Sequence, residues 1–504
     1  MSPTIGFQES LRPVLPTVLG CKDYEEEKQL LERVDRVLKV SGVEGMFLGL
    51  SRLNFESRAR EAKEAEERVQ VGGEALDRYL RKSLQALRCT VLKALVGGGY
   101  REMSTRLAHS PMYRWFCGCE DFEVIRVPGK STLAEYAHWL SAEEMEDVLS
   151  TLTRAVSDEN AARIIGLENE LDMMAAWVDT TCLEANVHFP TDWILLRDGI
   201  RTLIGSIQTI RRHGLKKRMP EPGSFLSEIN AQAMGMSATG RKPGSKKARK
   251  KILRRMKKIC QIVETHGRRY RETLDKEWDQ TDLTRKEAEV ILRRMDNVLA
   301  QLPAARRQAH ERIIGERQVS SAEKILSLYE PDIHVVVRGK AGAQVEFGNS
   351  LFIAETGAGF IFDHELRQGV APGDAKWLQE RYAIMQKKTG GQLCGVTADR
   401  GFDSKANRKS LAALEHFNGL CPRDPAQLEL RHAKDEVFSI AQRRRAQTES
   451  RVGIFKNVFL DGLPRAKTFA HRELQVAWAV LAHNLWVLVR QPWVEERIDQ
   501  AQAA

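Results

Sequence analysis

Apolar residues recur at helical spacing through long parts of this chain and cluster into short continuous runs elsewhere. Residues 24–70 and the block from about 73 to the Gly97-Gly98-Gly99 break carry apolar side chains every three or four positions, which predicts amphipathic helices. Short segments separated by Gly and Pro follow, including YREMSTRLAHS, MYRWFCG and STLAEYAHWL, and a Thr132/Glu135 capping box is expected to open the last helix. The amino-terminal third is therefore predicted to be helical.

Short apolar runs typical of buried strands appear later in the chain. MMAAWVD ends at Asp179 and LCGVTAD ends at Asp399, so each run is expected to deliver an aspartate to the carboxyl end of a sheet. HVVVRGK, AQVEFG and the strand-turn-strand segment LFIAETGAGFIFDHEL add strands, and DAKWLQERYAIMQKK predicts an amphipathic helix. In the tail, Trp478 and Trp486 share one helical face, which is typical of core packing. Together these segments predict an α/β core.

A helix-forming stretch from about 200 to 330 interrupts the predicted strands. It contains RKPGSKKARKKILRRMKK, in which 11 of the 18 residues at 241–258 are basic. Because each cation that neutralises a phosphate releases a counterion, this density favours contact with a DNA backbone, although a charge run is commonly a solvated helix face. The lysines expected to make this contact are Lys246, Lys247, Lys250 and Lys251. The GRKPG sequence at 240–244 also resembles, more weakly, an arm for the minor groove.

Composition is consistent with a nucleic-acid partner. The 504 residues include 78 Lys and Arg against 68 Asp and Glu, a formal charge of +10. No apolar run reaches about 18 residues and MSPTIGFQES lacks the apolar core of a signal peptide, so a soluble cytoplasmic protein is expected. Of eight scattered cysteines, Cys117 and Cys119 form a C-x-C pair without a matching second pair, which favours reduced, mostly buried thiols over a zinc site.

Asp179, Asp399 and Glu449 are the candidate catalytic residues. Phosphodiester chemistry is helped by two divalent cations about 3.5–4 Å apart, and Mg²⁺ prefers oxygen ligands. Three carboxylates would meet that need. Alternatives stay open for each residue: Asp399 fits a turn or helix cap, Glu449 fits a solvated helical carboxylate, and Glu184 and Asp192 compete with Asp179.

Four segments resemble successive motifs of bacterial insertion-sequence DDE transposases of the ISNCY type. They are VDTTCLEANVHFPTDWILLRD, VEFGNSLFIAETGAGFIFD, TADRGFDSKANRKSL and RRRAQTESRVGIFKN, and the resemblance covers roughly residues 75–490 with an interruption. The family's third motif is Y-(2)-R-(3)-E-(6)-K; Arg445, Glu449 and Lys456 keep that spacing, while Gln442 replaces the tyrosine. At about 100° per residue these three side chains would share one face of a helix.

The resemblance implies an RNase H-like mixed sheet as catalytic core, with an all-helical amino-terminal region and a basic helical insertion. In this division residues 1–72 are a helical segment, 73–168 a helix-turn-helix-like DNA-binding domain and 169–490 the catalytic domain, interrupted at about 200–330. Asp179, Asp399 and Glu449 would bind two Mg²⁺ or Mn²⁺ ions, and Arg445 and Lys456 would position DNA phosphates.

The implied activity is transposition of an insertion sequence. Such an enzyme binds terminal inverted repeats in double-stranded DNA, cleaves the ends as an endonuclease and joins them to a target, acting as a homo-oligomer of at least two subunits at the bacterial nucleoid. Two alternatives stay open: a nuclease on the same core that cuts without joining, and a transposase-derived DNA-binding regulator without activity. Residues 73–168 are alternatively a helical domain for protein contacts alone.

Overall fold

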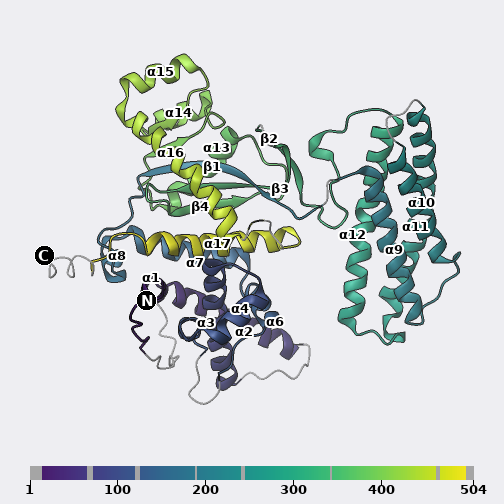
Figure 1. Cartoon of the computed structure of the whole chain (residues 1–504), viewed down its shortest axis with the longest axis horizontal. Coiled ribbons are helices and arrows are strands. Elements are labelled where there is room, and N and C mark those ends of the chain that lie inside the picture. Colours follow the sequence, from purple (N-terminus) through teal and green to yellow (C-terminus); the bar gives the residue numbers. More distant parts are fainter. Residues whose placement is uncertain are drawn as a thin grey trace.

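The computed structural model describes residues 14–64, 72–119, 125–187, 190–239, 244–340, 343–460, 462 and 466–494. Figure 1 shows an amino-terminal group of helices, a sheet with its own helices above that group, and a helical bundle set to one side. The mixture of helices with one mixed sheet confirms the predicted combination of α and β structure.

Eight helices form the amino-terminal group, and their positions confirm the pattern of apolar residues and glycine breaks. They are α1 (Lys22–Val40), α2 (Val43–Glu64), α3 (Gly73–Val96), α4 (Tyr100–His109), α5 (Pro111–Cys117), α6 (Lys130–Tyr136), α7 (Ala142–Ser157) and α8 (Glu159–Ile165). Arg88 of α3 is fully buried and forms ion pairs with Asp35 of α1 and Glu44 of α2. Their buried apolar side chains belong to the same cluster as those of the sheet, so this group and the core share one hydrophobic interior.

The expected capping box at Thr132 and Glu135 is wrong. Helix α6 begins at Lys130 with Gly129 as its N-cap, which leaves Thr132 inside the first turn. The same sequence pattern forms a capping box at the start of the next helix, α7. There the Ser141 side chain accepts from the Glu144 N–H, and the Glu144 side chain accepts from the Ser141 N–H. A Ser/Thr-x-x-Glu pattern thus marks a helix start only where the preceding backbone is extended.

The sheet has six strands, β1 (Ala175–Glu184), β2 (His334–Lys340), β3 (Ala343–Glu355), β4 (Ile361–Leu366), β5 (Gly395–Ala398) and β6 (Phe417–Leu420). Their order is β2-β3-β1-β5-β6, and β4 also pairs with β3. Strand β1 lies in the middle, antiparallel to β3 and parallel to β5, and β5 is parallel to β6. The chain therefore changes from antiparallel to parallel pairing across β1.

The prediction that the first strand ends at Asp179 is wrong. Strand β1 continues through Thr180 to Glu184, because these residues pair with Gly348 to Phe352 of the long strand β3. The parallel partner β5 covers only Ala175 to Val178 of β1. Asp179 therefore sits at the end of the parallel pairing and in the middle of the antiparallel pairing.

Helices α13 (Asp374–Lys388), α14 (Lys405–Ala413), α15 (Pro425–Lys434), α16 (Glu436–Ile454) and α17 (Phe469–Leu488) accompany the sheet, with a π-helical turn, η4 (Phe455–Phe459), after α16. Helix α17 runs between the sheet and the amino-terminal helices (Figure 1) and is buried on nearly all sides. Asn484 bonds both the N–H and the carbonyl of Ile361 in β4, while the Trp478 indole donates to the Ala137 carbonyl. The core-packing role expected for Trp478 is confirmed.

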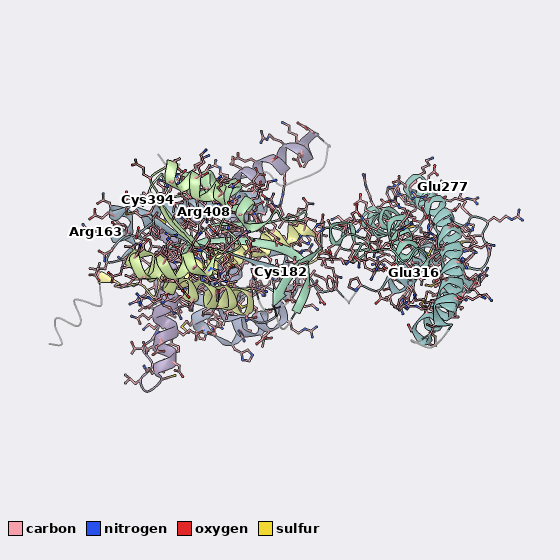
Figure 2. The ribbon with its side chains drawn as sticks, turned by 90° about the horizontal axis from the view of Figure 1, so that it is seen from above. Arg163, Cys182, Glu277, Glu316, Cys394 and Arg408 are labelled. Carbon is pink, nitrogen blue, oxygen red and sulfur yellow. The ribbon has the colours of Figure 1, made fainter. Side chains whose placement is uncertain are left out.

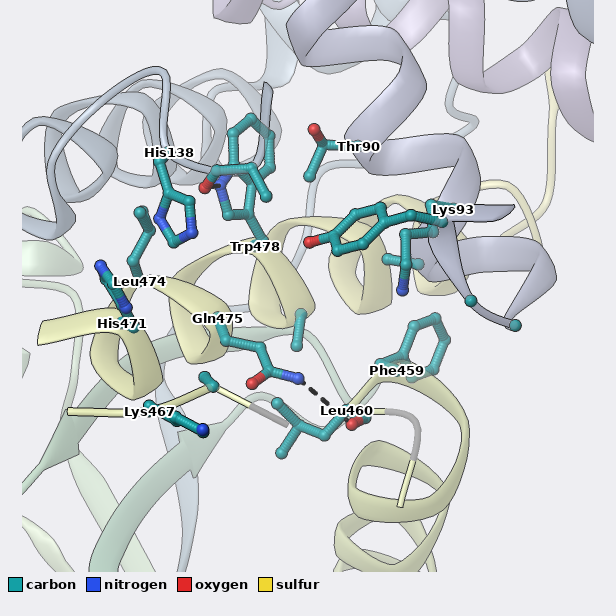
Figure 3. Close-up of a pocket in the computed structure, with 17 residues that line it drawn as sticks. Thr90, Lys93, His138, Phe459, Leu460, Lys467, His471, Leu474, Gln475 and Trp478 are labelled. Carbon is teal, nitrogen blue, oxygen red and sulfur yellow. Dashed lines mark hydrogen bonds between the residues drawn. The ribbon is translucent and has the colours of Figure 1, made fainter. Parts of the chain in front are cut away.

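A cavity of about 290 Å³ lies between α17 and the amino-terminal helices (Figure 3). His138 and His471 approach each other there with ring centroids 4.4 Å apart, and Gln475 donates to the Leu460 carbonyl at 3.4 Å. This cavity contains no carboxylate in its lining. It is separate from the candidate catalytic residues.

The predicted insertion is a bundle of four helices, α9 (Asp192–Arg212), α10 (Pro222–Ala238), α11 (Ser245–Glu277) and α12 (Arg285–Ala309), with short helical turns η1 (Trp278–Gln280), η2 (His310–Ile314) and η3 (Ser321–Glu323). Its buried side chains form their own apolar cluster. Seen from above, Glu277 and Glu316 of the bundle lie well away from Cys394 and Arg408 of the core (Figure 2). Residues 240–243 of the suggested minor-groove arm lie outside the described residues. Among those described, no helix is long and apolar enough to cross a bilayer.

Candidate active site

Parallel pairing brings Asp179 and Asp399 to the same edge of the sheet. Val178 of β1 is in register with Ala398, the last residue of β5. The next residue on each strand is an aspartate, so the two carboxylates leave adjacent strands at matching positions. Asp399 also stabilises the turn that follows, because its Oδ1 accepts the Gly401 N–H at 2.8 Å. Asp399 therefore has both roles that the sequence left open: it stabilises a turn, and it lines the candidate site.

Helix α16 delivers Glu449 because several strands hold that helix in place. The Trp177 indole of β1 donates to the Ala441 carbonyl at 3.0 Å. Gln442 donates to the Ala398 carbonyl of β5 at 3.2 Å and to the Gly419 carbonyl of β6 at 2.5 Å. The residue that departs from the family motif thus binds the helix to the strand ends next to Asp399.

A third attachment comes from Glu355 at the end of β3, whose side chain is 2 % exposed. Its Oε1 accepts from Arg444 at 3.0 Å, from Thr448 at 2.8 Å and from Arg451 at 3.4 Å. Positions 444, 448 and 451 are one helical turn apart in succession, so one buried carboxylate fixes a whole face of α16. Arg444 also lies 4.7 Å above the Trp177 ring. These contacts set both the position and the rotation of the helix that carries Glu449.

Asp179, Asp399 and Glu449 line one cavity of about 580 Å³. Strand β2 and the loop before α13 complete its wall, including His334. The structure thus brings together all three carboxylates expected from the sequence.

Burial and like charge make Asp179 hard to ionise. Burial raises the pKa of its carboxyl to about 6, and repulsion from Asp399 and Glu449 adds to this increase. The Thr180 N–H and the Arg445 guanidinium lower the pKa and so oppose the shift. The carboxyl group is therefore partly protonated near neutral pH without a cation nearby. Since an added cation would reverse the repulsion, the charge distribution favours binding of a positive ion here.

The chemistry of this donor set fits a hard divalent cation, because carboxylate oxygens are the ligands that Mg²⁺ and Mn²⁺ prefer. In their present positions, no three His, Cys, Asp or Glu side chains among the described residues are gathered closely enough to hold a metal. The Glu449 side chain is 58 % exposed and accepts from Arg445 at 2.7 Å. An exposed pair of this kind is worth about 0.3–0.5 kcal/mol, so it opposes reorientation of Glu449 only weakly.

The sequence missed Asp374, a fourth carboxylate that lines the same cavity. It lies in the first turn of α13, and its Oδ1 accepts from the Thr180 hydroxyl at 3.0 Å. A methyl group built on Gly401 would lie 2.5 Å from Asp374 Oδ2 and 3.0 Å from Asp399 Oδ1, so both carboxylates border one small space. The sequence did contain a feature that could have identified Asp374, namely an aspartate at a helix start after VAPG. An aspartate at that position is also found in ordinary helices without a catalytic role, so the feature is not specific.

The other candidate residues are placed as follows. Arg445 contacts Glu449 at the cavity. Lys456 lies beyond the end of α16, in the π-helical turn, so the angle expected for an uninterrupted α-helix does not apply to it. The turn brings Phe455 and Phe459 against His483 of α17, at centroid distances of 5.9 and 5.2 Å, which accounts for the change in helical pitch.

Two carboxylates that competed with Asp179 lie elsewhere. Glu184 ends β1, outside the lining of the cavity. Asp192 begins α9 in the bundle, where it is buried and accepts from Gln308 and Arg312, each at 2.9 Å. Neither residue competes for the site.

The cysteines follow the sequence expectation. Cys89, Cys117 and Cys119 are buried together in the amino-terminal group, and none of the eight cysteines forms a disulfide. Hydrogen bonding to Cys117 and Cys119, together with burial, holds the pKa of the Cys89 thiol well above its usual range. The Cys89 thiol therefore stays protonated.

Comparison of the chain with protein-family models, with curated proteins and with solved structures finds no match. The functional assignment therefore rests on the residues and their geometry.

Replacing Asp179 with Asn is expected to stabilise the metal-free protein. The pKa near 6 lies above the ordinary value of 3.8, so the folded state binds this proton more tightly than the unfolded state does. Stability then falls as pH rises from about 4 to about 6, and the penalty is complete above that range. In EDTA at pH 7.5, thermal unfolding should show Asp179→Asn more stable by roughly 1–2 kcal/mol.

The gain should become small at pH 4, where Asp179 is protonated in the folded state and only about half ionised in the unfolded state. Added Mg²⁺ should raise the melting temperature of the wild type more than that of the variant. A variant no more stable than wild type at pH 7.5 in EDTA would show that the carboxylate is not strained by its surroundings.

Removing the Glu355 side chain should release α16. Glu355→Ala leaves Arg444 and Arg451 without their buried partner, at a cost of about 2–4 kcal/mol in unfolding free energy. Amide hydrogen exchange should accelerate most along residues 436–454, because that helix loses its attachment to β3. Glu380→Ala is a matched control. Its pair with Arg367 is partly exposed, so the expected loss of unfolding free energy is about 0.5 kcal/mol or less. Unchanged exchange in α16 would contradict this role of Glu355.

Proposed function

We propose that this protein is a DDE transposase, with Asp179, Asp399 and Glu449 as its catalytic carboxylates. The observation that carries the proposal is their convergence on one cavity from β1, β5 and α16, although 270 residues separate the first from the last. A turn aspartate, a strand aspartate and a solvated glutamate would have no physical reason to meet. The pKa of Asp179 gives further support: burial raises it most, and repulsion from Asp399 and Glu449 adds to the shift, so the three carboxylates act on one another.

The strand arrangement supports an RNase H-like core. Leaving out β2, the order is β4-β3-β1-β5-β6, with β1 between an antiparallel and a parallel neighbour. Asp179 lies on the central strand, and Asp399 directly follows its parallel neighbour. Helix α16 runs diagonally across the sheet (Figure 1), and its Glu449 lines the cavity.

Each residue has a distinct role in the proposed reaction. Asp179, Asp399 and Glu449 would hold two Mg²⁺ or Mn²⁺ ions, which supply activation of the attacking oxygen and stabilisation of the leaving oxygen. Arg445 neutralises Glu449 and faces the same cavity edge, where it would orient a DNA phosphate, and Lys456 would bind the strand farther along. Buried Asp179 takes up or releases a proton near neutral pH, so ionisation and ion binding are coupled there.

The substrates would be the terminal inverted repeats of an insertion sequence and a target duplex. Cleavage with water frees a 3′-hydroxyl, and attack of that hydroxyl on target DNA joins the element without loss of phosphodiester bonds. Because two ends must be brought together, the active form would be a homo-oligomer of at least two subunits, working on the bacterial nucleoid in the cytoplasm. The amino-terminal helices would recognise the repeats.

Two other functions remain to be separated from this one. A nuclease on the same core would cut end DNA but would not join it to a supercoiled target, so a strand-transfer assay distinguishes the two. A DNA-binding regulator derived from a transposase would need no catalytic residues. Convergence of the intact triad argues against the regulator.

Single changes of Asp179, Asp399 or Glu449 to Ala should abolish Mg²⁺-dependent cleavage and joining of labelled end DNA. Loss of one ligand disturbs both ions and the in-line geometry that they impose. DNA binding in a gel-shift assay should persist, because it depends on other surfaces. A melting curve for each variant excludes unfolding.

Glu184→Gln is the matched control, since Glu184 lies on the same strand as Asp179 but outside the cavity, and it should keep near wild-type activity. Asp192 is unsuitable because its loss would remove the partner of the buried Gln308 amide and of the Arg312 guanidinium. Substantial cleavage by a folded Asp399→Ala or Glu449→Ala variant would overturn the proposed function.

Asp374→Asn is expected to weaken the response to metal. Its carboxylate borders Asp399, so its charge should favour cation binding at the shared cavity. Cleavage should fall about tenfold at limiting Mg²⁺, a change of about 1.4 kcal/mol, and should recover at high Mg²⁺. Glu380→Gln, on the same helix α13, should leave the Mg²⁺ dependence unchanged; an equal loss at all Mg²⁺ concentrations would show that Asp374 acts only on the fold.

A further inference from the structure

Helix α11 divides its basic residues between two environments. One set has partners on the bundle: Lys246 and Lys250 pair with the partly exposed Glu316 at 3.2 and 2.7 Å, and Lys257 lies 2.9 Å from His310. In the same set, Arg255 pairs with Glu228, and Arg249 lies 5.0 Å above the Trp193 ring. These cations already have partners within the chain.

The second set forms an outer stripe, defined as Lys247, Lys251, Arg254 and Lys258. All four residues are exposed, and spacings of four, three and four place them within about 60° of one another on the helix. The opposite face of α11 is buried through Leu253, Met256 and Ile259. Within the described part of the chain, no ion pair or side-chain hydrogen bond joins the outer stripe to a carboxylate.

Local sequence explains why the stripe has no acidic partner. From Glu228 to Glu264 the chain contains no other Asp or Glu, and both of those glutamates are engaged by arginines. Like charges at this spacing destabilise a helix by a few tenths of a kcal/mol per pair. The same helix beyond Glu264 carries acidic and basic residues in paired positions, including Arg268 with Glu264 and Lys276 with Glu272. The excess charge is thus confined to one end and one face.

We propose that the outer stripe binds the sugar-phosphate backbone of double-stranded DNA, an inference that rests on the proposed function for the choice of partner. Four cations spread over about 16 Å of helix axis match a polyanion with one charge per about 1.7 Å. Because Lys and Arg on one exposed face contact phosphates and not base edges, this binding is independent of sequence. The bundle stands apart from the core that contains the carboxylates (Figure 2), so the stripe would contact DNA away from the reacting bond.

The structure also refines which lysines of the basic run contact DNA. Lys247 and Lys251 belong to the outer stripe, whereas Lys246 and Lys250 neutralise Glu316. Arg254 and Lys258 extend the contact surface along the same face. The two lysine pairs have the same residue types, number and helical spacing, so they form a matched comparison.

The test measures binding of the full-length protein to a duplex of unrelated sequence at several salt concentrations. Replacing all four stripe residues with Gln should reduce the slope of log K against log salt by about 0.9 for each lost phosphate contact, to a maximum of about 3.6. In the double variant Lys247→Gln/Lys251→Gln this slope should decrease by about 1.8. In Lys246→Gln/Lys250→Gln it should decrease by less than half of that amount. A melting curve confirms that each variant is folded.

Equal slopes for wild type and the quadruple variant would overturn the proposal, and so would equal losses for the two double variants. Either result would leave the outer stripe as a solvated face or a site for an acidic protein. Cleavage of end DNA by the Asp399→Ala variant is measured in a separate assay from the salt dependence of DNA binding. Failure of the carboxylate assignment therefore cannot be mistaken for failure of the stripe, because Asp399→Ala should keep the wild-type salt slope.

Discussion

The buried carboxylate of Glu355 is the contact on which the geometry of the candidate site depends. It is one group with three donors from successive turns of α16, and it lies at the end of the strand adjacent to the one that bears Asp179. Without partners, a buried carboxylate would destabilise the fold because it loses its hydration. With two arginines and a threonine as partners, it holds α16 in a specific position. Backbone carbonyls of β5 and β6 add polar contacts through Gln442. Glu449 is therefore positioned by residues that have no chemical role themselves.

The candidate site was predictable to the extent that it depends on local patterns. Continuous apolar runs identified β1 and β5 with their aspartates, and the spacing of Arg445 and Glu449 identified α16. The sequence could not show that β1 continues past Asp179, because that length is determined by pairing with β3. Asp374 was missed for a similar reason: its sequence context is that of any helix start, and only the packing of α13 against β1 brings it to the cavity.

The same limit applies to the insertion. Its helical content and charge followed from composition, but the division of its cations into paired and unpaired sets did not. Glu316 is separated from Lys246 by 70 residues and reaches it only because the chain returns after α12. Pairing at that range is a tertiary property. Composition therefore identified the segment that carries the charge, while folding decided which charges face outward.

The place where the insertion joins the core gives it mechanical importance. The bundle is inserted between β1 and β2, so one connection continues directly from the strand that carries Asp179 and the other leads into the edge strand that borders the cavity. With its own apolar interior, the bundle is a separately packed unit attached to the core through these two connections. Tension applied to it would be delivered to β1 in the shear direction, along a ladder of eight paired residues with β3, which is the direction in which a sheet resists force best. The aspartate in the middle of that ladder would keep its position under such a load.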